Sequence, residues 1–360
     1  MNDISLPSSA RWLWGLVAAV LAALVWWHAA ILLPFVVSLI LAYVLRPAVD
    51  ALTARRCPRA LAASLCLLGV VLAGVVVFVL LVPIVSQLAP MLRTQLPDLL
   101  VGWWLQITPH LVQLGLPVPT SLNEVKAELM DLLHNHGAAW GATLWESLVV
   151  GGGNLMNLLG LALLIPMLAF YWLIDWERVM PPLRDLVPHR WRAAVSGFMD
   201  EADDLLGQYL RGQLWVMLIL AAYYSVGLML FGFDLALPIG VFTGLAVCIP
   251  YLGFGLGMVL ALLAGVLQFT AAGDNLWVPL IGVAVVYGAG QLIESFFLTP
   301  RLVGERIGLH PLGVIFALMV FGQWLGLWGL LVALPCAALL TVLGRRLLQA
   351  YRQGAFFLTE

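Results

Sequence analysis

The chain has 360 residues, of which 63% are hydrophobic and 10% charged, and its formal net charge at pH 7 is −2. Soluble domains are about 45–50% apolar, so this composition excludes an ordinary water-soluble globular protein. The small net charge provides no basic surface, and no nucleic-acid partner is expected. The apolar stretches are continuous rather than alternating, which favours membrane-spanning helices over a β-barrel.

Six stretches are apolar enough to be predicted as membrane-spanning helices. They cover residues 12–27, 29–45, 61–83, 147–174, 214–231 and 276–298. Crossing the ~30 Å hydrocarbon core takes about 20 apolar residues, so the first two helices are short and are expected to meet tightly near His28. No convincing small-residue cleavage site follows the first stretch, which is therefore predicted to be a retained helix rather than a signal peptide.

Arginines predict the orientation of these spans. They are concentrated after the second, fourth and sixth spans and near the end of the chain, at Arg46, Arg55, Arg56, Arg59, Arg178, Arg184, Arg190, Arg192, Arg211, Arg301, Arg306, Arg345, Arg346 and Arg352. Residues 84–146 contain only two basic residues, Arg93 and Lys126. By the positive-inside rule, the arginine-rich segments and both termini are predicted to be cytoplasmic, and residues 84–146 to lie outside.

Two further apolar stretches, residues 237–270 and 311–344, must each begin and end on one side of the membrane if this orientation holds. As a straight helix each would be about 51 Å long, well over the thickness of the bilayer core. Each has a glycine-rich middle, at residues 250–257 and 322–329. We therefore predict two helical hairpins that enter from opposite faces. The alternative is one tilted or kinked span for each stretch, which breaks the arginine pattern twice.

The two predicted hairpins resemble each other when the sequence is shifted by 73 residues. The shift gives seven identities over residues 238–257, among them Gly253 with Gly326, and it places Tyr251 on Trp324. It also places the fifth span on the sixth, which is predicted to run in the opposite direction. Inverted repeats of this kind are typical of secondary transporters. The predicted fold is all-α: a polytopic helical membrane protein with about six full spans plus two helical hairpins in a candidate inverted repeat.

Two segments outside the membrane have helical patterns. Residues 84–146 contain a capping box at Ser121 and Glu124 followed by an apolar stripe, which predicts a small extracytoplasmic helical cap. His134 and His136 in this cap do not share a helix face, so a metal site is not favoured. Residues 175–211 contain an amphipathic helix that fits either a membrane interface or a subunit contact.

The acidic side of that helix, at Asp200, Glu201, Asp203 and Asp204, is interpreted as a solvated face rather than a cation site. The predicted domains are the first three transmembrane helices (residues 1–83), the cap (84–146), the fourth transmembrane helix (147–174), the cytoplasmic amphipathic region (175–211), a transport core with both hairpins (212–344) and a cytoplasmic tail (345–360).

Glu294 is the only carboxylate well inside an apolar stretch, with Gln291 upstream and Pro300 and Arg301 downstream. An ionisable group at membrane depth costs about 2.5–3.5 kcal/mol on insertion scales and usually marks an ion or substrate pathway. These four residues are therefore candidate pathway residues. The alternative is that Glu294 is an anchor near the inner end of its helix and extends toward Arg301 and the lipid headgroups.

The hairpin tips are the second set of candidate pathway residues, at Pro250, Tyr251, Gly253, Gln323 and Gly326. Unwound backbone at the tips would expose peptide groups that only a wet or protein-lined cavity can satisfy. Tyr251 and Gln323 offer hydrogen bonds without charge. The alternative is that the glycines simply allow close packing of helices.

Several blocks of sequence resemble the autoinducer-2 exporter family of bacterial permeases, the PerM-like group. The blocks lie at residues 33–47, 170–175, 249–253, 291–311 and 326–337, and the most specific contains Gln291-Leu-Ile-Glu294 followed by Thr299-Pro-Arg-Leu-Val-Gly304. The resemblance spans almost the whole chain. It implies an oligomeric transporter of the bacterial inner membrane that moves a small solute, such as autoinducer-2, outward.

The residues themselves agree with a transporter and not with an enzyme. The sequence contains no HExxH metal pair, GxSxG elbow or phosphate-binding loop, so neither an enzymatic activity nor a cofactor is predicted. The expected partners are a small-molecule solute, the lipid bilayer, a coupling proton or sodium ion, and further copies of the chain. Two alternatives are open: a cation–proton antiporter in which Glu294 titrates, and a non-transporting membrane scaffold that acts through the cap and the cytoplasmic helix.

Overall fold

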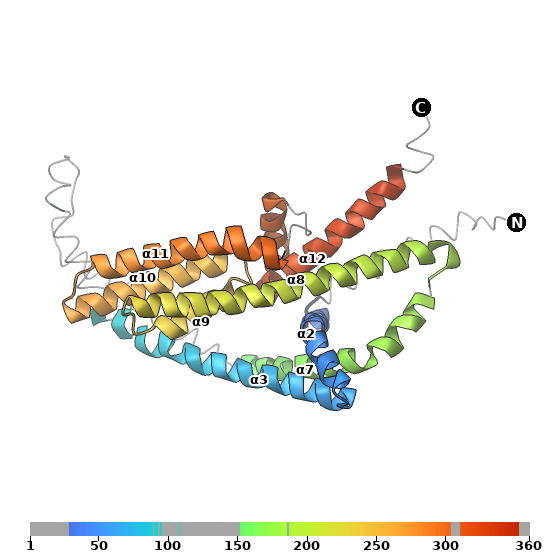
Figure 1. Cartoon of the computed structure of the whole chain (residues 1–360), viewed down its shortest axis with the longest axis horizontal. Coiled ribbons are helices and arrows are strands. Elements are labelled where there is room, and N and C mark those ends of the chain that lie inside the picture. The colour runs from blue at the N-terminus through green and yellow to red at the C-terminus, as the bar shows by residue number, and fades with distance from the viewer. Residues whose placement is uncertain are drawn as a thin grey trace, which may run out of the picture. The chain divides into compact units, whose positions relative to one another are not determined.

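The computed structural model describes residues 29–88, 90–92, 94–95, 108, 152–185, 187–303 and 310–352. These residues form helices joined by short turns, and no strand occurs among them (Figure 1). The predicted span at residues 12–27 lies outside the described residues, as do most of the predicted cap and the tail from residue 353 onward. The all-α fold predicted from the sequence is confirmed.

The helices follow one another along the chain with few breaks. They are α2 (Ala29–Ala54), α3 (Arg59–Pro83), the π-helix η1 (Ile84–Leu88), α7 (Gly152–Asp185), α8 (His189–Leu230), α9 (Ala236–Ala246), α10 (Leu252–Ala272), α11 (Trp277–Ile293), the π-helix η4 (Glu294–Val303) and α12 (Pro311–Arg352). The amphipathic region and the fifth span, predicted as separate elements, are largely one continuous helix, α8.

Six helices of the described chain are long and apolar enough to cross a membrane: Ile31–Ala54, Arg59–Leu92, Trp191–Leu230, Leu252–Ala272, Trp277–Leu302 and Trp328–Gln349. Four of them correspond to predicted spans, and the other two, Leu252–Ala272 and Trp328–Gln349, belong to the stretches predicted as hairpins. The apolar helix in the described part of the fourth predicted span, Gly160–Trp176, is shorter than these six.

Helix α3 has a surface that is too apolar to be stable in water. Its apolar side chains are largely exposed, for example Phe78 at 63%, Val79 at 60% and Leu72 at 56%. An apolar surface of this extent is rare on a soluble monomer and is stable against lipid chains. The exposed apolar face of α3 is therefore a lipid or protein contact surface.

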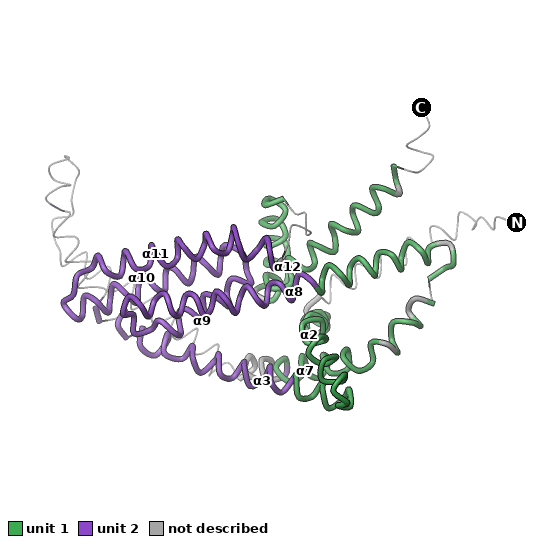
Figure 2. The backbone as a smooth tube through the Cα atoms, viewed as in Figure 1, with its two compact units in different colours: residues 1–66, 161–207, 307–360 green, residues 67–160, 208–306 purple. Residues whose placement is uncertain are grey.

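The chain divides into two compact units (Figure 2). Unit 1 comprises Met1–Cys66, Leu161–Gly207 and Ile307–Glu360, and unit 2 comprises Leu67–Gly160 and Gln208–Arg306. The units are discontinuous in sequence, whereas the predicted domains are consecutive blocks. Residues 212–344, predicted as one transport core, are shared between the units, with α9 and α10 in unit 2 and α12 in unit 1.

The first predicted hairpin consists of α9 and α10, which are joined by residues 247–251. The prediction placed unwound backbone at residues 250–257, and this is wrong beyond Tyr251, because α10 begins at Leu252. The two arms are also unequal. With 11 residues α9 is about 16 Å long, and with 21 residues α10 is about 32 Å long, so only α10 matches the bilayer core.

The second predicted hairpin is α12, which breaks at Gly326. That residue has φ 62° and ψ −141°, a backbone conformation almost restricted to glycine, and it separates two helical arms (Figure 1). The arms pack closely beside the break. A Cβ atom on Gly329 would collide with the carbonyl group of Phe321, and one on Gly322 would lie 2.8 Å from the Leu330 side chain.

Unit 2 has a core of buried apolar side chains contributed mainly by α8, α9, α10 and α11. Helices α8 and α9 approach each other through small residues. Gly240 packs on the backbone of Ser225, and Gly244 packs on the backbone of Ala221, so that a Cβ atom on either glycine would overlap α8. This small-xxx-small contact is typical of helix pairs in membranes.

Gln268 of α10 ties the α8–α9 turn to the bundle. Its amide nitrogen donates to the carbonyl oxygen of Gly232 at 2.8 Å, and its amide oxygen accepts from the backbone N–H of Asp234 at 2.9 Å. Gly232 follows the end of α8 at Leu230 and has φ 79°. The side chain of Gln268 therefore satisfies two polar backbone groups of the turn between α8 and α9.

Candidate functional site

Glu294 lies where α11 ends and the π-helix η4 begins, and its side chain is half-buried. π-helical turns are rare and are frequently found at functional sites. Gln291, one turn earlier, donates from its amide nitrogen to Ser295 Oγ at 3.0 Å. The amide oxygen of Gln291 and the carboxyl group of Glu294 thus lie on adjacent turns of one helix, and Pro300 lies exposed further along η4.

Arg301 does not extend back to Glu294. Its guanidinium carbon lies 5.8 Å from the centre of the Phe297 ring, and within the described chain it forms no ion pair with Glu294. The interpretation of Glu294 as an anchor that extends toward Arg301 and the lipid headgroups thus gains no ion pair from the structure and stays a prediction.

Buried hydroxyl groups gather in unit 2 between α8, α9 and α11. Tyr224 and Tyr287 stack with ring centroids 4.7 Å apart, and both are almost fully buried. The Tyr287 hydroxyl lies 2.9 Å from Thr243 Oγ1. Thr243 in turn donates its proton to the carbonyl oxygen of Ile239 at 2.8 Å, so Tyr287 is the donor to Thr243.

The neighbouring Tyr223 is also hydrogen-bonded, because its hydroxyl donates to the carbonyl oxygen of Val286 at 3.0 Å. Tyr224 differs. Its hydroxyl oxygen is buried and has no hydrogen-bond partner among the described residues. The hydroxyl end of the Tyr224 ring lies against Gly290, where a Cβ atom would be 2.7 Å from the hydroxyl oxygen, and Glu294 follows Gly290 by one helical turn.

The sequence analysis did not single out this cluster of Tyr223, Tyr224, Thr243 and Tyr287. The available signal was the presence of hydroxyl-bearing residues within otherwise apolar spans. Hydroxyl groups in a bilayer need hydrogen-bond partners, so each of these residues is expected to contact a polar group on a neighbouring helix or on its own helix.

The tip residues of the first hairpin lie together at the α9–α10 junction. Tyr251 is 66% exposed with φ 65°, and the carbonyl oxygen of Pro250 accepts from the backbone N–H of Leu252 at 2.7 Å. Gly253 is buried inside α10, where a Cβ atom would collide with the carbonyl group of Ala246. Close packing, the alternative interpretation of these glycines, therefore applies to Gly253.

The tip residues of the second hairpin belong to unit 1. Gln323 and Gly326 are both exposed, and no atom of another residue lies within 4 Å of a Cβ atom built on Gly326. The role of Gly326 is thus conformational. The structure joins Gln291 and Glu294 on one helix, gathers Pro250, Tyr251 and Gly253 at one turn, and leaves Gln323 and Gly326 in the other unit.

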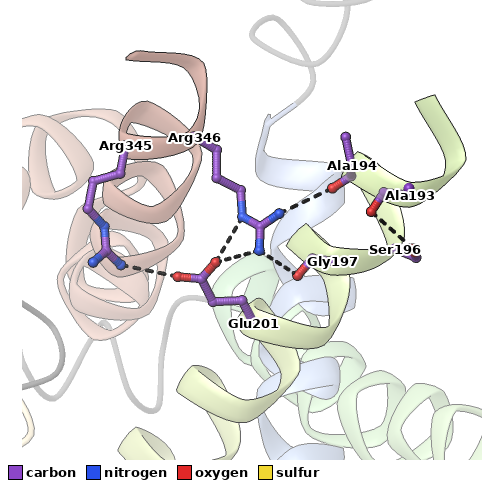
Figure 3. A network of polar contacts seen from close by, with 7 residues as sticks. All are labelled: Ala193, Ala194, Ser196, Gly197, Glu201, Arg345 and Arg346. Atoms are coloured by element: carbon purple, nitrogen blue, oxygen red, sulfur yellow. Dashed lines mark hydrogen bonds and ion pairs between the residues drawn. The ribbon is translucent and has the colours of Figure 1, made fainter. Parts of the chain in front are cut away.

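Unit 1 contains a polar network between α8 and α12 (Figure 3). The carboxylate of Glu201 accepts from Nη2 of Arg346 at 2.7 Å and from Nη2 of Arg345 at 3.3 Å. Arg346 also donates to the carbonyl oxygen of Gly197 at 2.8 Å. The interpretation of this acidic side as a solvated face is therefore wrong for Glu201, because its carboxylate is paired.

A second set of ion pairs joins α8 to α2 and α3. Arg46 lies 3.8 Å from Asp203, and Asp50 lies 3.9 Å from Arg59. Asp203, like Glu201, is thus paired rather than merely solvated. The end of α2, the start of α3, the first half of α8 and the end of α12 are consequently linked within unit 1, and they must lie on the same side of a membrane that these helices cross.

Among the described residues, no group of three or more His, Cys, Asp or Glu side chains is placed to hold a metal ion. His134 and His136 lie outside the described residues.

Long apolar helices with lipid-type exposure, a break at Gly326 and a polar cluster buried between spans define a polytopic α-helical membrane protein of the transporter type. The chain belongs to the AI-2E transporter family: the family profile described as AI-2E family transporter matches residues 16–349. The family suggested by the sequence motifs is thereby confirmed, and the protein is a membrane transporter or permease.

Relatives from three bacteria match over most of their length, and their provisional names describe transport. YrrI of Bacillus subtilis, named a transport protein, is 28% identical over 331 residues, which cover 87% of this chain and 85% of YrrI. PerM of Escherichia coli K12, named a permease, is 27% identical over 323 residues, which cover 88% of this chain and 87% of PerM. MT0215 of Mycobacterium tuberculosis, named a transport protein, is 29% identical over 348 residues, which cover 92% of this chain and 88% of MT0215.

Proposed function

We propose that the protein exports a small polar solute, such as autoinducer-2, across the bacterial inner membrane by alternating access. The observation that carries the proposal is the hydroxyl cluster of unit 2, which lies where α9 packs with α8 and α11, two helices long enough to span the bilayer, and where Tyr224 packs on Gly290 one turn before Glu294. Polar groups at membrane depth are expensive, and they usually mark the route of a solute or an ion.

Alternating access requires segments that can change conformation beside a fixed polar site. The turn between α9 and α10, which ends at Tyr251 in unit 2, is one candidate for such a segment. The break at Gly326, in unit 1, is a second point at which a helix can bend. Tyr251 and Gln323 are exposed at these breaks and can offer hydrogen bonds to a hydroxyl-rich solute.

The proposed orientation has both termini in the cytoplasm. The ion pairs of unit 1 support it, because they link four arginine-bearing or acidic helix ends that the positive-inside rule assigns to one side. The exposed apolar face of α3 supports contact with lipid and with further copies of the chain.

Flux measurements on the purified full-length protein in liposomes would test this function. A panel of small polar solutes, autoinducer-2 included, is loaded inside or outside vesicles, and efflux is followed with and without proton and sodium gradients. We expect solute flux that Glu294→Gln suppresses while expression and assembly stay normal. Absence of flux for the whole panel, with ion gradients in either direction, would reject solute export.

Cation–proton antiport is the second candidate, and the unpaired hydroxyl of Tyr224, which lies against α11 one turn before Glu294, favours it. A carboxyl group with a buried hydroxyl beside it can exchange a proton for a metal cation without any organic solute. The same vesicles distinguish the two functions. Sodium flux against a proton gradient in the absence of solute identifies an antiporter, whereas ion flux that requires solute identifies a coupled exporter.

A further inference from the structure

The buried hydroxyl of Tyr224 is not explained by packing. Tyr224 is fully buried, and its hydroxyl oxygen has no hydrogen-bond partner among the described residues. An unpaired buried hydroxyl destabilises a protein, and a phenylalanine of the same shape avoids this cost. The two neighbouring tyrosine hydroxyls, on Tyr223 and Tyr287, do have partners. The hydroxyl of Tyr224 is therefore a candidate group for binding a ligand.

The geometry directs this hydroxyl toward Glu294. Its oxygen faces Gly290, where only the absence of a side chain lets the ring approach α11. Glu294 follows Gly290 by four residues and so lies one turn further along the same face. Side chains of a helix lean back toward its N-terminus, so the carboxyl group of Glu294 is directed toward the turn at Gly290, where the Tyr224 hydroxyl from α8 lies.

The surroundings suit a small cation. The contact of Tyr224 with Gly290 keeps the two helices close, which suits a single ion better than a solute of several atoms. The amide oxygen of Gln291 is a further acceptor, because its amide nitrogen already donates to Ser295. Among the charged and titratable groups of the packed elements, the hydroxyls of Tyr223 and Tyr287 are committed elsewhere, and Arg301 lies against Phe297.

We propose that the Tyr224 hydroxyl and the Glu294 carboxyl group bind one monovalent cation, a proton or a sodium ion. A sodium ion takes oxygen ligands from both side chains. A proton resides on the carboxyl group, which then donates a hydrogen bond to the tyrosine oxygen. As the coupling site of transport, this assignment rests on the proposed function, and it adds a residue on α8 to the predicted pathway.

Two adjacent tyrosines provide a matched pair of variants. Tyr223→Phe removes the hydrogen bond to Val286 and is expected to lower the thermal unfolding midpoint of the protein in detergent. Tyr224→Phe removes a hydroxyl that the protein itself does not satisfy, so the midpoint should be unchanged or raised. Cation binding should respond in the opposite way: it should be weakened in Tyr224→Phe and unchanged in Tyr223→Phe.

Binding is measured on the full-length protein in detergent, by equilibrium uptake of radioactive sodium and by infrared difference spectra of carboxyl protonation. Glu294→Gln identifies the signal of Glu294 in both. For a sodium site, Tyr224→Phe should raise the half-saturating sodium concentration about tenfold, equivalent to about 1.4 kcal/mol. For a proton site, Tyr224→Phe should shift the carboxyl band of Glu294, because the band reports its hydrogen bond.

The proposal is overturned if Tyr224→Phe matches the wild type in both measurements. It is also overturned if the wild type neither binds sodium nor shows a carboxyl band that Glu294→Gln removes. Cation binding that is sensitive to Tyr224→Phe supports the site even where liposomes show no solute flux. That combination rejects the proposed export function alone.

Discussion

Replacing Arg346 by alanine should destabilise unit 1 by about 2 kcal/mol, four times or more the effect of replacing Arg345. The guanidinium of Arg346 contacts the Glu201 carboxylate through Nε at 2.8 Å and through Nη2 at 2.7 Å, and it donates to Gly197 at 2.8 Å (Figure 3). Arg345 makes a single contact with Glu201 at 3.3 Å.

The size of the predicted destabilisation follows from the solvent exposure of the paired side chains. The side chains of Arg346 and Glu201 are 35% and 39% exposed, so solvent screening limits their pairing to about 1 kcal/mol. The hydrogen bond from the charged group to the Gly197 carbonyl adds about 1 kcal/mol. The Arg345 side chain is 56% exposed, and its single longer contact should contribute less than about 0.5 kcal/mol.

The assay is a double-mutant cycle that combines Glu201→Gln with Arg346→Ala and, as the matched control, with Arg345→Ala. Unfolding free energies are measured in mixed detergent micelles. The Glu201–Arg346 coupling energy should be about 1 kcal/mol, and the Glu201–Arg345 coupling energy close to zero. Equal costs for the two arginine variants, or no coupling between Glu201 and Arg346, would refute the reasoning.

Three further predictions concern topology and packing. Cysteines at Gly273 should react with an impermeant label from outside, and cysteines near Arg346 only from the cytoplasm; outside labelling near Arg346 would reject the second hairpin. Gly253→Val should abolish folding, because its side chain meets backbone, whereas Gly326→Val should cost about 1–3 kcal/mol of strain and still assemble, as gel filtration can show. Gln268→Ala should lower the unfolding midpoint by freeing the groups at Gly232 and Asp234, and Gln268→Glu should lower it as well, because a carboxylate oxygen then faces the carbonyl oxygen of Gly232.

The sequence predicted the parts of the fold that depend on local composition. Continuous apolar runs predicted the spanning helices, and the glycine-rich middle of residues 311–344 predicted the break near Gly326. The boundary predicted between the cytoplasmic helix and the fifth span does not interrupt α8, because a change from a mixed to an apolar surface near Arg211 does not end a helix.

Two glycines that the 73-residue shift pairs with each other have different physical roles. Gly326 adopts a backbone conformation that other residues avoid, and nothing packs against it, whereas Gly253 is helical and touches the backbone of Ala246. Residue type alone does not distinguish these roles. The turn of the first hairpin therefore lies earlier than predicted and has its positive φ at Tyr251, a residue type rarely associated with that conformation.

The candidate site was only partly predictable. Glu294 stands out in sequence because a carboxylate is conspicuous in an apolar run. Tyr224 does not stand out, because a tyrosine fits an apolar span, and its meaning depends on contacts between helices distant in sequence. The hydrogen bond from Tyr223 to Val286, for example, joins residues 63 positions apart.

The glycine contact between α8 and α9 determines which parts of unit 2 can move. Gly240 and Gly244 sit against the backbone of Ser225 and Ala221 with no side chain between them, so sliding either helix by a fraction of a turn would drive neighbouring side chains into backbone. A contact of this kind holds the two helices in a fixed position relative to each other and does not allow them to slide. Any conformational cycle must carry α8 and α9 as one rigid piece, and the contact of Gly253 with the backbone of Ala246 holds the start of α10 to the same piece.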